Sequence, residues 1–176
     1  MILFSTLYFF MPAYIANSIP PLLHRFKLFS YLAVPVDFKK EFLGKRIFGD
    51  HKTIRGVLGI FFIGFILCFL FFEINSDFRV YEYVGRNSLL FCALYSLGII
   101  FGDLLFALIK RRLNLKPGAA FIPFDQTNYV IGVFILTQWL VQLDLYIWGI
   151  IWMQTFVLHT VFNRFGYYLG LHNAKW

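Results

Sequence analysis

Two acidic residues stand out in this sequence because cationic side chains lie nearby along the chain. Asp103 occurs in the apolar stretch IIFGDLLFALIKRR, and Asp125 ends the basic loop KRRLNLKPGAAFIPFDQ. A carboxylate inside an apolar segment is costly unless it is paired or binds a metal. Carboxylates that flank a basic patch can hold Mg²⁺ and a nucleoside triphosphate. The pattern favours a metal or substrate site, and a hydrogen-bonded or ion-paired core acid is the alternative.

Lys110 belongs to the same group of polar residues as Asp103. It follows Asp103 by seven residues, close to two helical turns, so the two side chains share one helix face. An internal salt bridge between helical neighbours is the structural interpretation of this spacing. Asp125 has its own structural interpretation, as the N-cap of a following helix. The KRR run, residues 110–112, also fits a simple cytoplasmic anchor.

A second polar segment, GDHKTIRG at residues 49–56, lies directly before a long uncharged run. Thr53 is well placed to cap a helix there, and a helix N-terminus attracts phosphate. Lys52 and the forked guanidinium of Arg55 would add positive charge, and His51 could donate to a phosphate. The segment matches neither a P-loop nor a dinucleotide-binding motif. Anchoring at the membrane surface is the alternative.

The elements that must position these side chains are membrane helices. Of the 176 residues, 60% are hydrophobic and 14% charged, whereas soluble domains carry about 25% charged residues. A net charge of +7 therefore indicates basic loops at a membrane and no nucleic-acid partner. A membrane-spanning helix needs about 20 mostly apolar residues. Five apolar runs approach this length, at residues 2–23, 54–73, 88–109, 128–143 and 146–170.

The distribution of Lys and Arg predicts how these runs are oriented. Fourteen of the 16 cations lie in the first loop, the third loop and the C-terminal region, and the second loop holds only Arg79 and Arg86. Because basic loops stay in the cytoplasm, we expect an N-terminus outside and a C-terminus inside. The fold class is therefore an all-α, polytopic membrane protein with about five transmembrane helices and two basic cytoplasmic loops. Residues 1–176 form a single domain in the cytoplasmic membrane.

The first run contains prolines and one amide that need an explanation. Pro12, Pro20 and Pro21 are predicted to interrupt the helix, and Asn17 lies between them. Irregular backbone at this depth must be covered by protein or line a cavity. We interpret the segment as one wall of a lipid-accessible groove, with a simple kink as the alternative. Cys68 and Cys92 both lie in apolar runs and are expected to be packing residues.

Six segments, in this order along the chain, together resemble one known family. They are PAYIAN, IPPLL, VD, GKRIFGDHKTIRG, GDLLFALIKRRLNLKPG and PFDQ. Each segment is unspecific alone, but their combination looks like the CDP-archaeol synthase family, which is related to the CDP-diacylglycerol synthases. The resemblance extends from Pro12 to about Asn128 by motif and further by hydropathy.

This resemblance implies a Mg²⁺-dependent cytidylyltransferase. Such an enzyme transfers CMP from CTP to an ether-linked isoprenoid glycerol phosphate of the membrane and releases pyrophosphate. By the same resemblance, Asp103 and Asp125 would bind Mg²⁺ and, with Lys110, would be catalytic. The substrate contacts would come from Asn17, near the glycerol, and from His51, Lys52, Thr53, Arg55, Arg111 and Gln126.

Two positions depart from the family pattern. Ala107 stands where the family usually has Ser, and Asn128 replaces the second acid of DQxD. Asn keeps an oxygen ligand but loses a negative charge, which weakens a Mg²⁺ site. Three alternatives therefore stay open: the same chemistry on another lipid phosphate such as phosphatidic acid, a non-catalytic lipid-phosphate-binding protein, and a small transporter. Association of several copies is also left open.

Overall fold

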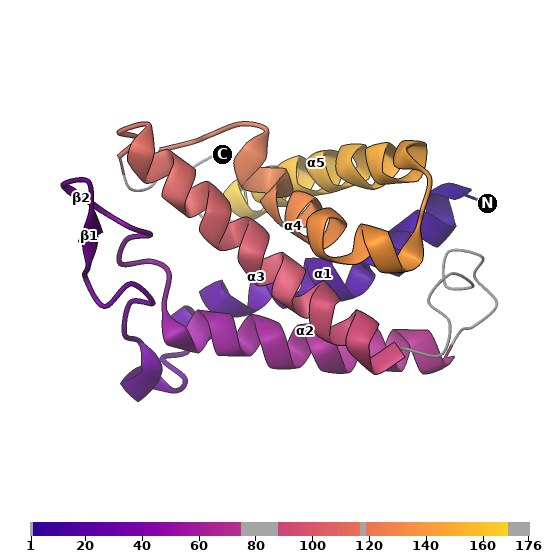
Figure 1. Cartoon of the computed structure of the whole chain (residues 1–176), viewed down its shortest axis with the longest axis horizontal. Coiled ribbons are helices and arrows are strands. Elements are labelled where there is room, and N and C mark those ends of the chain that lie inside the picture. The colour runs from indigo at the N-terminus through magenta and orange to yellow at the C-terminus, as the bar shows by residue number, and fades with distance from the viewer. Residues whose placement is uncertain (1, 75–87, 117–118, 169–176) are drawn as a thin grey trace.

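The computed structural model describes residues 2–74, 88–116 and 119–168 (Figure 1). Within this part of the chain, the structure consists of α-helices and one small hairpin. The helices are α1 (Ile2–Arg25), α2 (Ile54–Ile74), α3 (Ser88–Arg112), α4 (Phe124–Val141) and α5 (Leu145–Tyr168). A 3₁₀ turn, η1 (Ser30–Leu32), and the antiparallel strands β1 (Glu41–Phe42) and β2 (Lys45–Arg46) lie between α1 and α2.

The five apolar runs predicted from sequence correspond to these five helices, which confirms the all-α membrane fold. Among the described residues, α1, α2, α3 and α5 are long and apolar enough to cross a membrane. The remaining helix, α4, has only 18 residues. It starts at Phe124, four residues before the predicted apolar run, because Asp125, Gln126 and Thr127 continue the helix although they are polar.

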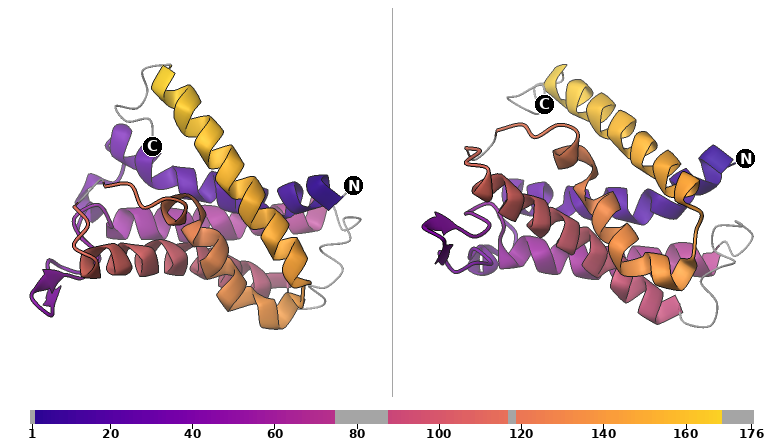
Figure 2. Two further views of the ribbon diagram at one scale, coloured as in Figure 1. Left: turned by 90° about the horizontal axis from the view of Figure 1, so that it is seen from above. Right: turned by 45° about the horizontal axis from the view of Figure 1, so that its top comes forward.

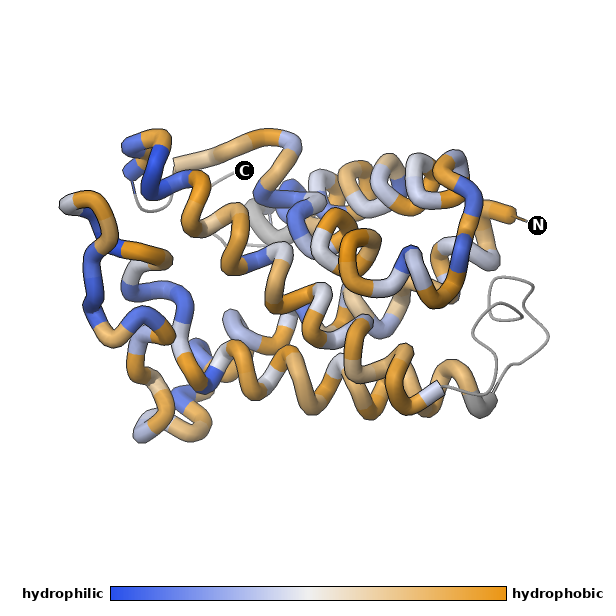
Figure 3. Tube along the Cα trace, viewed as in Figure 1, coloured by the Kyte–Doolittle hydropathy of each residue, from blue (hydrophilic) through white to orange (hydrophobic). Residues whose placement is uncertain are grey.

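The polar loops gather at one end of the helix bundle. Figure 1 places the hairpin and the end of α3 at this end, and the N-terminus and the α4–α5 turn at the other. In Figure 3 the hydrophilic segments concentrate at the end with the hairpin, whereas α2 is almost uniformly hydrophobic. The two basic loops therefore lie together. The predicted loop with Arg79 and Arg86, and the tail with Lys175, lie outside the described residues.

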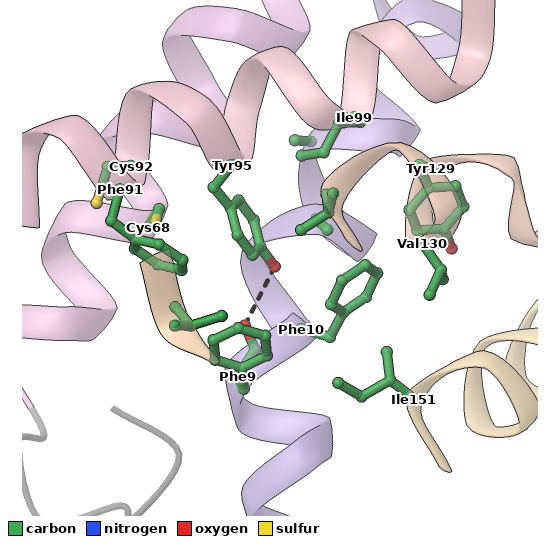
Figure 4. Packing of buried hydrophobic residues seen from close by; sticks show 14 of the residues in the cluster. Phe9, Phe10, Cys68, Phe91, Cys92, Tyr95, Ile99, Tyr129, Val130 and Ile151 are labelled. Carbon is green, nitrogen blue, oxygen red and sulfur yellow. Dashed lines mark hydrogen bonds between the residues drawn. The ribbon is translucent and has the colours of Figure 1, made fainter. Parts of the chain in front are cut away.

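Aromatic side chains from α1, α3 and α4 form the centre of the bundle (Figure 4). Phe9, Phe10 and Tyr95 are at most 1% exposed, and Phe10 stacks on Tyr129 with ring centroids 5.8 Å apart. Cys68 and Cys92 are free, buried thiols beside this cluster, as a packing role predicts. Figure 2 shows α5 running obliquely across α1, where the Tyr14 and Thr155 hydroxyls are 3.0 Å apart.

The prediction that the prolines interrupt the first helix is wrong, because α1 continues through Pro12, Pro20 and Pro21. Prolines inside a helix are tolerated in membrane bundles, where neighbouring helices pack around them. Next to Pro12, the Tyr95 hydroxyl donates to the Phe9 carbonyl oxygen at 3.1 Å. At the other end Pro20 packs against Gly56 of α2, where a Cβ would approach the proline Cβ to 3.4 Å.

The closest helix crossing in the described part of the chain is between α3 and α4, and it depends on three glycines. A Cβ at Gly98 would lie 2.6 Å from Cα of Val133, and a Cβ at Gly102 would collide with the Asn128 carbonyl oxygen. Gly132 faces both of these glycines from α4. Small residues spaced by four positions allow helix backbones to approach in this way. The crossing fixes Asp103, the next residue after Gly102, beside Asn128.

Candidate active site

A cavity of about 270 Å³ lies among residues from the two basic loops and the helices next to them. It lies between the N-terminal approach to α2, the last turns of α3 and the first turn of α4. Its charged and polar lining comes from residues far apart in the sequence, which the fold brings together. The lining residues are Phe48, His51, Lys52, Asp103, Phe106, Ala107, Lys110, Arg111, Asp125 and Asn128.

Asp103 forms an ion pair across the cavity with the segment before α2. Its Oδ1 lies 2.5 Å from Nζ of Lys52, and the Asn128 side-chain amide approaches the same oxygen at 3.5 Å. The Lys52 side chain is 28% exposed and that of Asp103 is 20% exposed, so the pair remains in contact with solvent. Asp103 is therefore paired between elements, and the pairing within α3 that its spacing to Lys110 also allowed is not formed.

Lys110 instead pairs with Asp125 of α4. Its ammonium lies 2.7 and 2.9 Å from the two carboxylate oxygens and also donates to the Ala119 carbonyl oxygen at 2.7 Å. The Asp125 carboxylate accepts the Phe121 backbone N–H, which lies before the helix. Asp125 itself lies in the first turn of α4, after the helix start at Phe124. The structure thus replaces the N-cap interpretation of Asp125 with an ion pair that closes the α3–α4 loop.

The GDHKTIRG segment reaches the cavity through its middle residues. The Thr53 hydroxyl accepts the Gly56 backbone N–H at 3.2 Å, which confirms the predicted cap of α2. His51 and Lys52 line the main cavity and also a smaller one of about 50 Å³. Thr53 lines only the smaller cavity, which continues towards Pro20 of α1. His51 and Lys52 therefore lie between the main cavity and a smaller one next to α1.

Three residues predicted to bind substrate, Asn17, Arg55 and Gln126, do not line either cavity. The Arg55 side chain is turned away and donates through Nη1 to the Leu28 carbonyl oxygen at 2.8 Å. Arg55 is only 7% exposed, so it acts as a buried tie between α2 and the turn that follows α1. Asn17 is half-buried on α1. The predicted contacts of Arg55 with phosphate and of Asn17 with the glycerol stay predictions.

The position of Arg55 leads to a testable prediction. We expect Arg55→Ala to lower the free energy of unfolding by about 1 kcal/mol, because the turn after α1 loses a charged hydrogen-bond donor. The KM for CTP, the nucleotide that the family resemblance implies, should stay within about twofold of the wild-type value, since ground-state binding is untouched. Thermal unfolding in detergent and CTP saturation kinetics measure the two quantities. A large rise in KM without loss of stability would place Arg55 on the nucleotide.

Two buried amide oxygens lie close to the acidic residues without a protein partner. Asn128 is 7% exposed and Gln126 is 4% exposed, and neither Asn128 Oδ1 nor Gln126 Oε1 accepts a hydrogen bond. Asn128 lines the cavity, but Gln126 does not. An oxygen left without a donor in this way is available to a cation. Of the two, Asn128 Oδ1 is the oxygen that can act together with the carboxylates.

The donor set fits a magnesium ion that is shared with a substrate. Among the described residues, no three His, Cys, Asp or Glu side chains form a ready-made metal site. Mg²⁺, however, is commonly held by one or two carboxylates and completed by phosphate oxygens and water. Asp103 and Asp125, together with the Asn128 oxygen, supply that kind of incomplete set. Both carboxylates would then exchange a lysine partner for the cation.

The cavity carries a small excess of positive charge. Three cations, Lys52, Lys110 and Arg111, face two carboxylates, Asp103 and Asp125, which leaves one positive charge. Arg111 also has a buried Nε without a partner. An electropositive cavity with unused donors suits a polyphosphate. The arrangement can therefore hold a triphosphate chain and a divalent cation side by side.

Sequence reasoning missed the residue that organises the loop above the cavity. The Asp37 side chain is fully buried and accepts hydrogen bonds from Arg46 and from the backbone N–H groups of Lys39, Phe48 and Gly49. Burial alone raises the pKa of Asp37, but the bonds from Arg46, Gly49, Phe48 and Lys39 outweigh burial and hold that pKa well below its usual value. Asp37 is the acid of the VD segment in the family resemblance, but no residue type or spacing around it indicated this role.

Comparisons with known proteins agree with this architecture. A family model described as CarS-like, CDP-archaeol synthase, matches residues 1–176. The CDP-archaeol synthase of Methanoculleus marisnigri is 30% identical over 94% of this chain and 99% of its own length. That of Pyrococcus furiosus is 38% identical over 71% of this chain and 69% of its own.

The fold also has a counterpart among solved structures. A protein described as an intramembrane enzyme for archaeal membrane lipids biosynthesis matches with a TM-score of 0.72. It covers 89% of this chain and 91% of its own, at 23% sequence identity. At this level of identity the likeness concerns the arrangement of the helices.

Proposed function

This chain belongs to the CDP-archaeol synthase family, and we propose that its basic cavity transfers CMP from CTP to an ether-linked isoprenoid glycerol phosphate. The observation that carries this proposal is the pairing of two carboxylates with three cations in one cavity at the end of a membrane bundle. A lipid phosphate lies at the membrane surface and CTP comes from the aqueous phase. A site at that boundary can receive both substrates.

The reaction joins the two substrates through one phosphorus atom. An oxygen of the lipid phosphate attacks the α-phosphorus of CTP, a new P–O bond forms, and the bond to pyrophosphate breaks. The protein contributes to such a transfer mostly by positioning the groups and balancing their charge. Lys52 comes from the segment before α2 and Lys110 from α3, and each pairs with a different carboxylate, so their ammonium groups can bind different parts of the triphosphate.

Asp103, Asp125 and the Asn128 oxygen would hold the magnesium ion. Bound Mg²⁺ neutralises phosphate charge and makes the α-phosphorus a better electrophile. Arg111 has an unused buried nitrogen and would bind the pyrophosphate that leaves. The smaller cavity towards Pro20 would receive the glycerol phosphate end of the lipid, with Thr53 and His51 at its polar rim.

The orientation proposed for the protein follows from the same cavity. The two basic loops meet at one end of the bundle, and CTP is available only in the cytoplasm. We therefore infer that this end faces the cytoplasm and that the protein spans the cytoplasmic membrane several times. The lysines and arginines of both loops would then face the anionic inner leaflet.

The experiment that tests this function is a transfer assay with purified protein in detergent. Labelled CTP and Mg²⁺ are offered with digeranylgeranylglycerol phosphate or with phosphatidic acid, in separate reactions. We expect a labelled CDP-lipid from the isoprenoid acceptor. Preference for phosphatidic acid would change the acceptor class. Folded protein that forms no product with either acceptor and binds no CTP would overturn the proposal.

A second prediction concerns the amide that replaces a family acid. Asn128 lies against Asp103, so Asn128→Asp adds a negative charge next to a carboxylate. That charge strengthens the affinity for a divalent cation bound between them. We expect the Mg²⁺ concentration for half-maximal activity to fall about threefold to tenfold, in line with the sensitivity of metal sites to their charged neighbours. Gln142→Glu is the control, because Gln142 is exposed at the C-terminal end of the same helix and does not line the cavity. Unchanged Mg²⁺ dependence in Asn128→Asp would show that Asn128 does not contact the metal.

A further inference from the structure

Arg112, the last residue of α3, turns away from the cavity and binds the hairpin of the first cytoplasmic loop. Its guanidinium donates to the carbonyl oxygens of Phe42, Lys45 and Arg46, with distances of 3.2 Å to Lys45 and 2.9 Å to Arg46. The same group lies over the Phe42 ring, 5.5 Å from its centroid. Lys45 returns a hydrogen bond to the Arg112 carbonyl oxygen at 3.3 Å.

The hairpin is too small to hold this position by itself. Each strand has two residues, and an isolated hairpin is at best marginally stable in water. A guanidinium that reaches three carbonyl oxygens supplies charge-assisted hydrogen bonds from a separate element. Arg112 therefore attaches the loop to the end of α3. Arg112 does not line the cavity, although its neighbours Lys110 and Arg111 do.

On its other side the hairpin is connected to the cavity through Arg46 and Asp37. The Arg46 guanidinium forms ion pairs of 2.8 Å with both Asp37 and Asp50. Asp37 also accepts the backbone N–H groups of Phe48 and Gly49, each at 3.0 Å. Phe48 itself lines the cavity, and both residues lie shortly before the cavity-lining His51 and Lys52.

The backbone of Lys52 is held by the segment that contains Asp37. The Val36 N–H donates to the Lys52 carbonyl oxygen at 2.8 Å, and the Lys52 N–H donates to the Gly49 carbonyl oxygen at 3.3 Å. The hydrogen-bonded connection from α3 to Lys52 is thus continuous. It passes through Arg112, the hairpin, Arg46 and Asp37.

We propose that Arg112 is a positioning residue that fixes Lys52 over the cavity by tying the first cytoplasmic loop to α3. This inference rests on the proposed function for its kinetic part. Lys52 comes from a loop, whereas Asp103, Lys110 and Arg111 come from α3. Tying the loop to α3 sets the distance between the two groups of phosphate-binding side chains before CTP arrives. Such preorganisation reduces the ordering that binding must otherwise impose.

The test combines Arg112→Ala with hydrogen exchange and CTP kinetics on the full chain in detergent. We expect peptides within residues 41–52 to exchange about tenfold faster, because local opening needs less free energy. The KM for CTP should rise about tenfold while kcat changes less than about threefold, as for lost ground-state binding. Faster exchange with an unchanged KM would overturn the positioning role. Unchanged exchange would overturn the attachment itself.

Two further variants separate geometry from charge. Lys40→Ala removes one exposed cation from the same loop but leaves the contacts of Arg112 in place. Lys40→Ala should leave the hydrogen exchange of residues 41–52 and the KM for CTP near the wild-type values. A rise in KM as large as that of Arg112→Ala would show that only net charge matters. Arg112→Lys keeps the charge but cannot reach three carbonyls in a fork. Its hydrogen exchange and its KM for CTP should lie between those of the wild type and of Arg112→Ala. This variant tests the proposal if Arg112→Ala does not fold.

Hydrogen exchange also distinguishes this inference from the proposed function. If the wild-type protein formed no CDP-lipid, the function would fail. The exchange of residues 41–52 would still show whether Arg112 holds the loop, because that measurement needs no turnover.

Discussion

Asp103→Asn should abolish most Mg²⁺-dependent CDP-lipid formation while the protein stays folded. Asn retains the size of the side chain but cannot provide the negative charge that a divalent cation needs. Loss of one electrostatic contact in an active site typically lowers kcat about a hundredfold or more. Stability should change little, because Asp103 and its partner Lys52 are both partly exposed and such pairs contribute weakly. Turnover at saturating CTP and thermal unfolding in detergent measure both effects.

Asp144→Asn is the matched control for this prediction. Asp144 is exposed in the turn between α4 and α5, at the end of the bundle away from the cavity. The same change of charge and shape there should leave turnover and its Mg²⁺ dependence unchanged. If Asp103→Asn kept wild-type turnover, Asp103 would have no place in the reaction. If both variants lost activity equally, the effect would reflect overall charge.

Gly102→Ala should destabilise the protein and also impair the site, although the change adds a single methyl group. The new Cβ would collide with the Asn128 backbone, so α3 and α4 would have to separate. Overpacking of this kind commonly costs about 1–3 kcal/mol. Separation also moves Asn128 away from Asp103, and a displacement of about 1 Å can lower turnover about a hundredfold. We therefore expect a lower unfolding temperature and reduced kcat in the protein that folds.

Gly149→Ala provides the comparison within α5. A Cβ at Gly149 would meet no atom within 4 Å. Alanine favours the helix by about 0.5–1 kcal/mol over glycine, so this variant should be as stable as the wild type or slightly more stable. Wild-type stability and turnover in Gly102→Ala would mean that α3 and α4 do not cross as closely as described.

Much of the fold and the composition of the site followed from local patterns in the sequence. Apolar runs of about 20 residues predicted the five helices, because a hydrocarbon core accepts little else. Asp103 stood out because a carboxylate in such a run needs a partner. Thr53 was identified as a helix cap because capping depends on residues within one turn. Each of these inferences uses neighbours in the chain.

The pairing of charges could not be predicted in this way. Spacing along one helix suggested Asp103 with Lys110, but the structure joins Asp103 to Lys52 and Lys110 to Asp125. Both observed pairs connect different elements, so they depend on how helices cross. The crossing of α3 and α4 is set by Gly98, Gly102 and Gly132. The G-x-x-x-G spacing in α3 is a signal that would have indicated this close approach.

Arg55 and the prolines of α1 show the same difference between what local sequence predicts and what contacts between elements decide. Their residue types suggested a phosphate ligand and a broken helix, which are sound expectations for isolated segments. The tertiary contacts add what the residue types do not show. Arg55 binds the Leu28 carbonyl oxygen, and α1 continues through its prolines within the bundle. The sequence alone therefore determined the membrane environment, the helices and the chemical types in the site. Only the tertiary structure decided which charges meet, because that depends on distances between helix backbones that no local pattern encodes.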